Sequence, residues 1–540
     1  MDPKSYFSDV ITLQNKMMDL DNSNISDFIE YSKVNFSQSK SKVLQLLISL
    51  RSLATARPFI LMFARTIIFE FHEEIVTFFA SDELTKIFLG NNSLLLALFD
   101  IGAVTIDSIL KYSDSLNTFK FFFEQIQSNK NDYFCSKVDQ IPMLYYFCQK
   151  IKYEEHHLCQ IEGNNAERIA ASIRFDDLNN FQYFTRSRPF NSKIMYSIYD
   201  TNGIVSCIWK MPTFLEYAAF YGSSKVFNYL LRLYDENDLY PEENVMEYAV
   251  AGGDREIIHQ LEERNMTFTV QCLKNSITYF NKGIYDYIIR NSTNSEELSS
   301  YEIIFDSLSS YNIQSFMTFF TKDKLFLKNE NNETLLHIAV KNGYYDIVEF
   351  LLNEFRDFDI NAQDSYQRTP FLVSIMNENF EIMKLLFNQK SNDKNITDSL
   401  GQNALHYAAA IDNIEIFKYL LDKIPTIEDK VGNLPLHSAA IHGKLKILEF
   451  ILENNFQSVY LLTKQKQTIM HLAAGNGHLD LVDYFIFIFQ DEIGDFVNQP
   501  DKNGQTALHL AAINGKLDVV QALAGINEIK INITDVNVLK

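Results

Sequence analysis

The sequence of 540 residues is poor in cysteine and has no long uncharged hydrophobic segment. Its five cysteines are odd in number, widely spaced and without a CxxC pair, which favours a reducing compartment over a disulfide-bonded secreted protein. The most apolar long stretch, residues 58–80, contains three glutamates, an arginine and a histidine. A membrane span needs about 20 mostly apolar residues, so we interpret this stretch as a buried helix and expect no transmembrane segment.

Signals for export or for binding to polyanions are also missing. The first ten residues, MDPKSYFSDV, contain no basic segment followed by an apolar core, so we expect no secretory signal and a cytoplasmic protein. The net charge is −21, the pI is near 5.0, and no run of Lys or Arg suggests a nuclear signal. Nucleic acids and anionic membrane surfaces bind basic patches, so we expect neither as a partner.

Motifs for nucleotide binding and nucleophilic catalysis are absent. The sequence contains no GxGxxG, GxxxxGK[ST] or GxSxG. His72 and Glu73 begin like the zinc motif HExxH, but Val76 occupies the position of the second histidine. The adjacent pairs Glu73/Glu74 and Glu154/Glu155 would point about 100° apart on a helix, so we interpret them as solvated.

One cluster of cysteine and histidine remains as a candidate metal site. Its members are Cys148, His156, His157 and Cys159. Their spacing matches no familiar zinc pattern, and we interpret them as partly buried helix residues. We therefore expect no catalytic residue, no cofactor and no metal.

Six versions of one motif are present between Glu333 and Gly515. They read ETLLHIAVKNG, RTPFLVSIMNE, QNALHYAAAID, NLPLHSAAIHG, QTIMHLAAGNG and QTALHLAAING. The histidine column, 31 to 38 residues apart, consists of His337, Leu372, His406, His437, His471 and His509. The second copy departs most, because it lacks the histidine and the alanine pair.

Each column of the motif has a physical reason. An aspartate eight residues before the histidine column can bond the backbone of a tight turn, and Gly401 or Gly504 can supply the positive φ of that turn. Threonines such as Thr334 and Thr468 can cap a first helix, and glycines such as Gly343 can end it in a left-handed residue. Apolar residues then recur at helical spacing in a second helix.

The motif resembles the ankyrin repeat, which has a period near 33 residues and a TPLHxA core. The resemblance covers residues 326–540. It implies pairs of helices with short hairpin tips, and a scaffold that binds other proteins. It also implies that the histidines are structural and bond backbone groups within and between repeats. A metal-binding role would need convergent ligands, whereas these histidines lie one repeat apart.

The same rhythm is present in eroded form from about residue 161 to 325. EYAAFYGSSKVFNYLL and EYAVAGGDREIIHQL keep the alanines and glycine, with Glu216 and Glu247 in the histidine column. Together with ERIAASIR near residue 167, these segments resemble a domain of unknown function that precedes ankyrin arrays in trichomonad-type protist proteins. Upstream, apolar residues at three- and four-residue spacing predict helices over 42–54, 58–80, 93–112 and 116–126.

We therefore predict an all-α protein, an ankyrin-repeat solenoid of helix pairs preceded by a helical N-terminal region. The expected domains are a helical region over 1–160, degenerate helix pairs over 161–325 and the array of six repeats over 326–540. Near the end of the chain, Asn532 and Asp535 occupy positions where a further hairpin would begin. A truncated array, a frayed last repeat or a covering second molecule would each account for this.

The positions without a structural duty are candidates for contacting a partner. These are the hairpin tips and the ends of the first helices, which line the concave face in ankyrin geometry. The candidates are Tyr366, Arg368, Met376, Ile411, Val431, Ile441, His442, Gln465 and Ile513. The alternative for the four aliphatic residues at the helix ends (Met376, Ile411, Ile441 and Ile513) is that they pack between repeats.

The favoured function is a non-enzymatic, monomeric scaffold that binds a protein partner of unknown identity through the concave face of the array. Two alternatives remain at this point. One is an enzyme with a site in residues 1–160 and the array as its targeting arm, which a polar pocket with convergent titratable groups would reveal. The other is an adaptor of the membrane skeleton.

Overall fold

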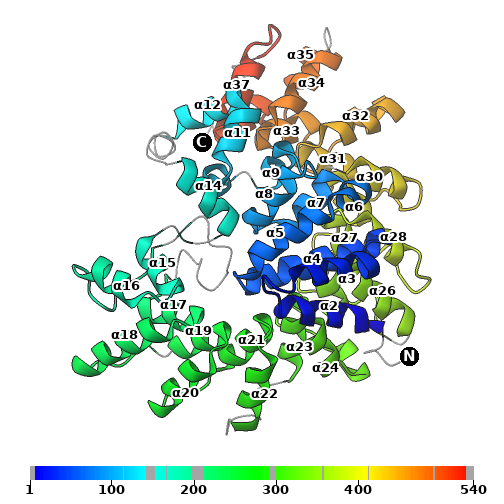
Figure 1. The fold of residues 1–540 in the computed structure, drawn as a ribbon. Coiled ribbons are helices and arrows are strands. Elements are labelled where there is room, and N and C mark those ends of the chain that lie inside the picture. Colours follow the sequence, from blue (N-terminus) through cyan, green and yellow to red (C-terminus); the bar gives the residue numbers. More distant parts are fainter. Residues whose placement is uncertain are drawn as a thin grey trace. The chain divides into compact units, whose positions relative to one another are not determined.

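The computed structural model describes residues 6–113, 115–141, 153–163, 165, 167–195, 197, 211–242, 244–291, 300–355, 358–411, 413–489 and 493–530. These residues form 35 α-helices and no strand, apart from one isolated bridge between Lys193 and Thr213. The predicted all-α fold is confirmed. The chain divides into two compact units, Met1–Lys324 and Leu325–Lys540 (Figure 1).

The first unit begins with a bundle of short helices. Their bounds are α2 (Ser8–Met18), α3 (Ile25–Phe36), α4 (Lys40–Ala56), α5 (Ile60–Glu70), α6 (His72–Phe78), α7 (Ser81–Phe88), α8 (Asn92–Asp100), α9 (Ile106–Tyr112), α10 (Leu116–Phe121), α11 (Phe123–Asn129), α12 (Asn131–Gln140) and α14 (Tyr153–Glu162). One hydrophobic core joins the bundle, with buried residues from Leu13 to Phe134. Among the described helices, none combines the length and apolarity required to cross a bilayer.

Three of the helices predicted in this bundle are each two helices in the structure. The predicted helix 58–80 is broken at Phe71, between α5 and α6, and the predicted helix 116–126 is broken at Phe122. The predicted helix 93–112 is broken where Gly102 adopts a φ of 71°. Thr105 then starts α9, because its hydroxyl accepts a hydrogen bond from the Ser108 amide at 3.2 Å. Apolar spacing continues through these breaks, so periodicity alone did not reveal them.

Five helix pairs follow in the same unit. They are α15 (Arg168–Arg174) with α16 (Leu178–Thr185), α17 (Phe214–Tyr221) with α18 (Ser224–Glu236), α19 (Val245–Gly252) with α20 (Arg255–Glu263), α21 (Val270–Thr278) with α22 (Lys282–Asn291), and α23 (Ser300–Ser309) with α24 (Ile313–Phe319). The first helices contact one another in series. The eroded repeats predicted from Glu167 onward therefore do fold as helix pairs.

A half-buried arginine connects the bundle to these pairs. Arg57 follows α4, and its guanidinium donates to the carbonyl of Gly252 at 2.6 Å and to that of Ala251 at 3.4 Å, at the end of α19. It also bonds the side-chain oxygen of Asn281, whose amide nitrogen donates to Val250 and Ala251. Burial lowers the pKa of the Arg57 guanidinium to about 10. Three partners on two elements hold this side chain, and it caps the carbonyl end of α19.

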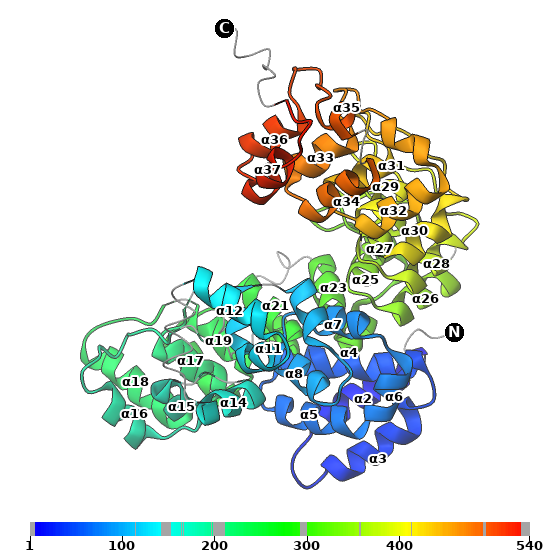
Figure 2. The same cartoon turned by 90° about the horizontal axis from the view of Figure 1, so that it is seen from above.

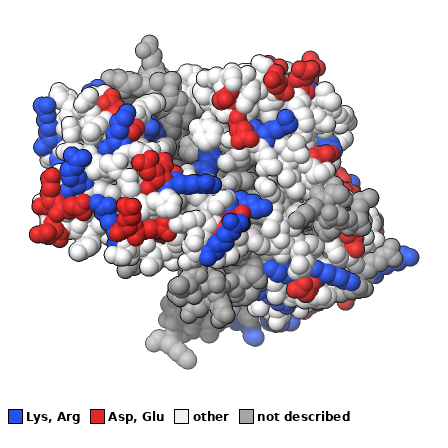
Figure 3. Space-filling model, turned by 60° about the horizontal axis from the view of Figure 1, so that its bottom comes forward, with Lys and Arg blue, Asp and Glu red and all other residues white. Residues whose placement is uncertain are grey.

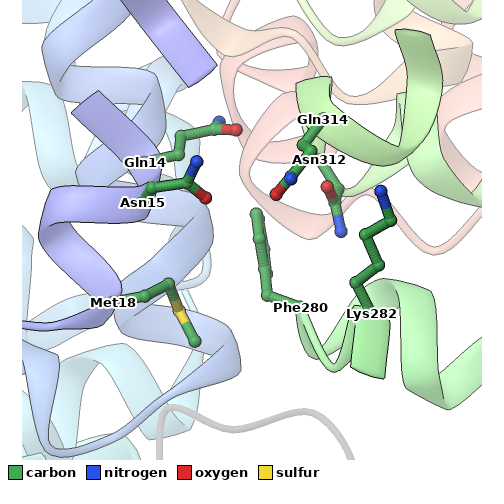
Figure 4. Close-up of a pocket in the computed structure, with 7 residues that line it drawn as sticks. All are labelled: Gln14, Asn15, Met18, Phe280, Lys282, Asn312 and Gln314. Carbon is green, nitrogen blue, oxygen red and sulfur yellow. The ribbon is translucent and has the colours of Figure 1, made fainter. Parts of the chain in front are cut away.

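A second connection within this unit joins α2 to the turn before α24. The side-chain amide of the buried residue Gln14 donates to the carbonyl of Tyr311 at 2.7 Å and accepts from the amide of Ile313 at 3.3 Å. Beside it lies a cavity of about 30 Å³, between Asn15 and Met18 of α2 and, facing them, Phe280 and Asn312 of two turns and Gln314 of α24 (Figure 4). Ligand pockets usually measure about 300–1,000 Å³, so this space fits a packing defect and not a substrate.

The second unit consists of six helix pairs, each with a first helix of seven or eight residues. They are α25 (Leu335–Lys341) with α26 (Tyr345–Glu354), α27 (Pro370–Met376) with α28 (Phe380–Phe387), α29 (Ala404–Ala410) with α30 (Ile414–Leu421), α31 (Pro435–Ile441) with α32 (Leu445–Asn454), α33 (Ile469–Asn476) with α34 (Leu479–Phe489), and α36 (Ala507–Ile513) with α37 (Leu517–Ala524). A short helix, α35 (Ile493–Val497), lies between the last two pairs. Figure 2 shows the first helices and the second helices as two adjacent rows. Asn532 and Asp535 lie outside the described residues.

Candidate partner-binding face

Buried aspartates hold the hairpin tips of the second unit. Asp364 accepts hydrogen bonds from the amides of Tyr366 and Arg368 at 2.8 and 2.9 Å, two and four residues along the chain. The same two bonds recur at the other aspartates of this column, which are Asp398, Asp429 and Asp501. Because the aspartates satisfy the turn from inside, the side chains at the tips are left to project outward.

Neighbouring tips are also joined through their backbones. The amide of Ser399 donates to the carbonyl of Tyr366 at 2.9 Å, and the amide of Lys430 donates to that of Leu400 at 2.9 Å. Ser365 and Lys502 make the equivalent bonds to the tips before them. Four of the five junctions between consecutive tips in this row thus carry the same backbone bond, and the described residues show no such bond between the fourth and fifth tips.

The histidines stabilise this row from beneath. In His337, Nδ1 accepts a hydrogen bond from the Thr334 amide at 3.2 Å, and Nε2 lies 3.0 Å from the carbonyl of Arg368 in the next repeat. The corresponding Nε2 atoms of His406, His437 and His471 lie 2.9, 3.1 and 3.1 Å from carbonyls of their following repeats. Burial lowers the pKa of these four histidines. The hydrogen bonds of these four histidines thus agree with the structural role that is expected for the histidine column.

Three tip side chains are large, apolar and exposed. Tyr366, Leu400 and Val431 expose 63%, 58% and 56% of their surface, and they occupy the same position in consecutive repeats. An isolated exposed apolar residue is ordinary, but three in register on one row form a surface. The predicted candidates Tyr366 and Val431 belong to this row, and so does Leu400, which is not among the predicted candidates.

Arg368 and Met376 extend the row at Tyr366. The Arg368 guanidinium is 2.7 Å from a carboxylate oxygen of the buried Asp364 and lies over the Tyr366 ring, 4.6 Å from its centroid. One of its nitrogens also donates to the Met376 sulfur at 3.5 Å. The arginine is therefore held in place by the carboxylate and presents the tyrosine ring and the methionine together, which pre-organises this end of the surface.

The ends of the first helices give a mixed result. Met376, His442 and Ile513 are exposed, and Ile441 is half-buried. Ile411 does not belong to an exposed strip, because it is only 8% exposed. The reason is local: Ile411 follows α29 in an extended conformation (φ −102°, ψ 168°), whereas Asn377 and His442 follow their helices with ψ near zero. The predicted aliphatic strip is therefore interrupted at the third repeat.

Gln465 lies on the same row at the fifth tip. Its side chain is exposed, and its backbone carbonyl accepts a hydrogen bond from the Lys502 amide at 2.8 Å. Sequence reasoning overlooked its basic neighbours on the row, which are Lys430, Lys464, Lys466 and Lys502. The signal that could have found them is the sign of the charge at each column of the repeat, read separately from the net charge of the chain.

The cysteine and histidine cluster of the first unit separates in the structure. His156 is buried, with Nε2 3.2 Å from the Phe121 carbonyl, and burial lowers its pKa to about 4. His157 is exposed and Cys159 is partly buried, while Cys148 lies outside the described residues. Over the part of the chain that is described, no three His, Cys, Asp or Glu side chains are placed to share a metal ion.

Comparison with known proteins places the second unit in a family. A profile of the ankyrin-repeat family matches residues 308–398, 371–460 and 456–535. The match starts within the eroded repeats, before the first complete repeat.

Individual relatives share only a part of their length with this chain. A human protein, transient receptor potential cation channel subfamily A member 1, is 29% identical over 163 residues, which is 28% of this chain and 14% of the channel. The probable 26S proteasome regulatory subunit p28 of Saccharomyces cerevisiae is 28% identical over 160 residues, 29% of this chain and 70% of the yeast protein. NAD-dependent deacetylase sir2B of Dictyostelium discoideum is 30% identical over 131 residues, which is 22% of this chain and 17% of the deacetylase. Proteins with very different names thus resemble this chain over a similar length. Residues 308–535 are thus ankyrin repeats, and the region of the chain before them is unassigned.

Proposed function

We propose that this protein is a non-enzymatic scaffold that binds a partner protein through the row of hairpin tips and the adjoining first helices of residues 325–530. Ankyrin repeats imply protein partners, and the relatives differ in what their names say they do. This supports a binding role for the shared repeats, independent of any one activity.

One observation supports the hairpin tips as the binding face. Tyr366, Leu400 and Val431 are exposed at tips whose turns are already satisfied by the buried aspartates. The fold gains little from large apolar side chains at these positions, whereas a protein interface gains from them. Tyrosine and arginine are also the residue types favoured at interface hot spots, and Tyr366 and Arg368 stack on each other.

The proposal extends to the rest of the chain in three respects. We assign the protein to the cytoplasm and expect it to act as a monomer. We identify residues 161–325 with the domain of unknown function that precedes ankyrin arrays in trichomonad-type protist proteins. The bundle before it serves as a structural cap on those helix pairs, consistent with the packing of Arg57 and Gln14 against them.

The test compares two exposed aromatic residues of the same unit. The full-length protein is immobilised, exposed to lysate of its source cells, and the captured proteins are quantified by mass spectrometry. Tyr366→Ala is expected to reduce capture of a specific protein by about 30-fold, the effect of losing a hot spot of about 2 kcal/mol. The matched control is Phe487→Ala on α34, at a side chain that is 70% exposed on the other row of helices. The proposed face would be contradicted if both variants captured as much of the protein as the parent does, or if both lost capture to the same extent.

A further inference from the structure

The chemistry of the hairpin tips changes along the row. The tips of the second, third and fourth repeats carry Tyr366, Leu400 and Val431. From the fourth repeat onward the tips become basic, with the exposed lysines Lys430, Lys464, Lys466 and Lys502. The row therefore has an apolar part followed by a basic part, in a chain of net charge −21.

The side chains of two of these lysines contact the backbone of the preceding tip. The Lys430 ammonium donates to the carbonyl of Ser399 at 2.7 Å, and the Lys464 ammonium lies 3.4 Å from the carbonyl of Lys430. One exposed carboxylate, that of Glu428, lies 3.7 Å from Lys464. For Lys466 and Lys502, the described residues provide no carboxylate within ion-pair distance.

Exposed carboxylates are sparse on this row, where Glu330 follows the turn position of the first tip and Glu428 precedes that of the fourth. The six first helices, α25, α27, α29, α31, α33 and α36, contain no Asp or Glu. The second helices carry ten: Asp346, Glu349, Glu354, Glu381, Glu415, Glu449, Glu453, Asp480, Asp483 and Asp518. The aspartates of the turns are buried and accept backbone hydrogen bonds, so they are not presented to a partner. Figure 3 shows one face of the molecule, on which acidic and basic side chains are interspersed.

We propose that the occupant of this row is an acidic, extended segment of a partner protein. Its apolar side chains pack on Tyr366, Leu400 and Val431, and its carboxylates pair with the lysines of the fourth to sixth tips. Packed helices are about 8–10 Å apart and an extended chain advances about 3.3 Å per residue, so about three residues of the partner pass each tip. The tips from Tyr366 to Lys502 then accommodate a segment of about 12 residues.

A protein segment fits this row better than a nucleic acid does. Half of the row is apolar, and the rest of the chain is acidic, whereas nucleic-acid surfaces are basic over their whole footprint. This inference rests on the proposed function, and it adds the chemical class of the partner.

The test uses defined probes and the full-length protein. A fluorescein-labelled 12-residue peptide with Leu and Phe in one half and four glutamates in the other is titrated by fluorescence anisotropy. A second peptide has glutamine in place of glutamate, and a third probe is a 12-nucleotide single-stranded RNA. The glutamate peptide is expected to bind about tenfold more tightly than the glutamine peptide at low salt, the summed effect of several exposed charge pairs, and to lose this preference at high salt.

Two triple variants of equal charge show where the peptide binds. The variant with Lys464→Glu, Lys466→Glu and Lys502→Glu is expected to lose the preference for the glutamate peptide. The control with Lys418→Glu, Lys423→Glu and Lys446→Glu, at exposed positions away from the tips, is expected to retain it. Circular dichroism checks that both variants are folded.

Three results would overturn the inference: no preference between the two peptides, equal loss in both triple variants, or tighter binding of the RNA than of either peptide. The capture experiment with Tyr366→Ala remains a separate test. Capture that depends on Tyr366 but not on the tip lysines would retain the binding face and reject the acidic partner.

Discussion

The capping boxes of α17 in the first unit and of α33 in the second begin their helices in the same way but connect to neighbouring pairs differently. In the first unit, Thr213 caps α17 and its amide donates to the carboxylate of Glu216 at 2.6 Å, a bond within one helix. In the second unit, His471 accepts from the Thr468 amide with Nδ1 and reaches the next repeat, at the Gln505 carbonyl, with Nε2. One imidazole both caps its helix and joins two repeats.

The difference shows two ways to hold a stack of helix pairs together. The second unit repeats the same bond in four of its six copies, so its stability is distributed over nearest-neighbour contacts. The first unit relies more on individual long-range side chains, such as Arg57, which bonds residues 194 and 195 positions away. Regular bonding also places the tips of the second unit in one row, which is the condition for a repeated binding surface.

The largest difference in stability between the two units is expected in acid. The buried histidines His337, His406, His437 and His471 have folded-state pKa values below 6.5, so the unfolded chain takes up protons first as the pH falls. Their contribution is fully present above about pH 6.5 and is lost below it. Among the described residues of the first unit, one histidine is comparable. This is His156, whose contribution to stability is lost as the pH falls from 6.5 to about 4. We expect the second unit to lose stability between pH 7 and pH 5 and the first unit to lose less, as measured by hydrogen exchange corrected for intrinsic rates.

Equal loss of protection in both units over that pH range would contradict the assignment. It would mean that the histidines do not control the acid sensitivity of the second unit.

Removal of Arg57 should affect the first unit alone. Arg57→Ala deprives the carbonyl of Gly252 and the side chain of Asn281 of their donor, and it leaves a space where the guanidinium was buried. We expect a loss of about 3 kcal/mol in the stability of the first unit, measured by hydrogen exchange of α19 and α21. Arg57→Lys keeps a charge but not the fork of donors, and should recover only part of the loss. A variant as stable as the parent would show that this contact is dispensable.

The capping residues offer a closer comparison of the two units. His471→Ala should cost about 2 kcal/mol, because both the Thr468 amide and the Gln505 carbonyl lose a partner. Glu216→Ala should cost about 1 kcal/mol, the usual effect of losing a helix cap. Denaturant unfolding of both variants measures this, with His442→Ala as the exposed control. A larger loss for Glu216→Ala would reverse our ranking of the two connections.

The smallest effect on stability is expected at the tips. Tyr366→Ala removes a side chain that is mostly exposed, so the free energy of unfolding should change by less than about 0.5 kcal/mol. A Tm close to that of the parent, together with reduced partner capture, would show that the tips serve binding and not folding. Substantial destabilisation would instead assign Tyr366 to the support of Arg368.

The sequence was sufficient for those parts of the fold that depend on local contacts. Turn aspartates, capping threonines and left-handed glycines act within a few residues, so the positions of the repeats could be predicted from their columns. Exceptions occur where neighbours override local preference. Gln367, Glu378 and Lys466 adopt φ values of 60°, 55° and 58°, a conformation that favours glycine, because the repeats on either side fix the turn.

Features that depend on distant residues could not be read from the sequence. The burial of Ile411 follows from its own extended conformation after α29, and the partners of Arg57 are 194 to 224 residues away. The candidate face was only partly foreseen. Tyr366, Arg368, Val431 and Gln465 follow from their columns, whereas the absence of carboxylates on the first helices became meaningful once those helices formed one row.

The most direct test of the binding face is site-specific photo-crosslinking in the full-length protein. A photoreactive phenylalanine is placed at position 366, at position 431, or at position 487 on the other row of helices, and each protein is irradiated in lysate of its source cells. We predict that the same partner protein is crosslinked from positions 366 and 431 and not from position 487. Crosslinking of a shared partner from position 487 alone would contradict the assignment of the hairpin tips as the binding face.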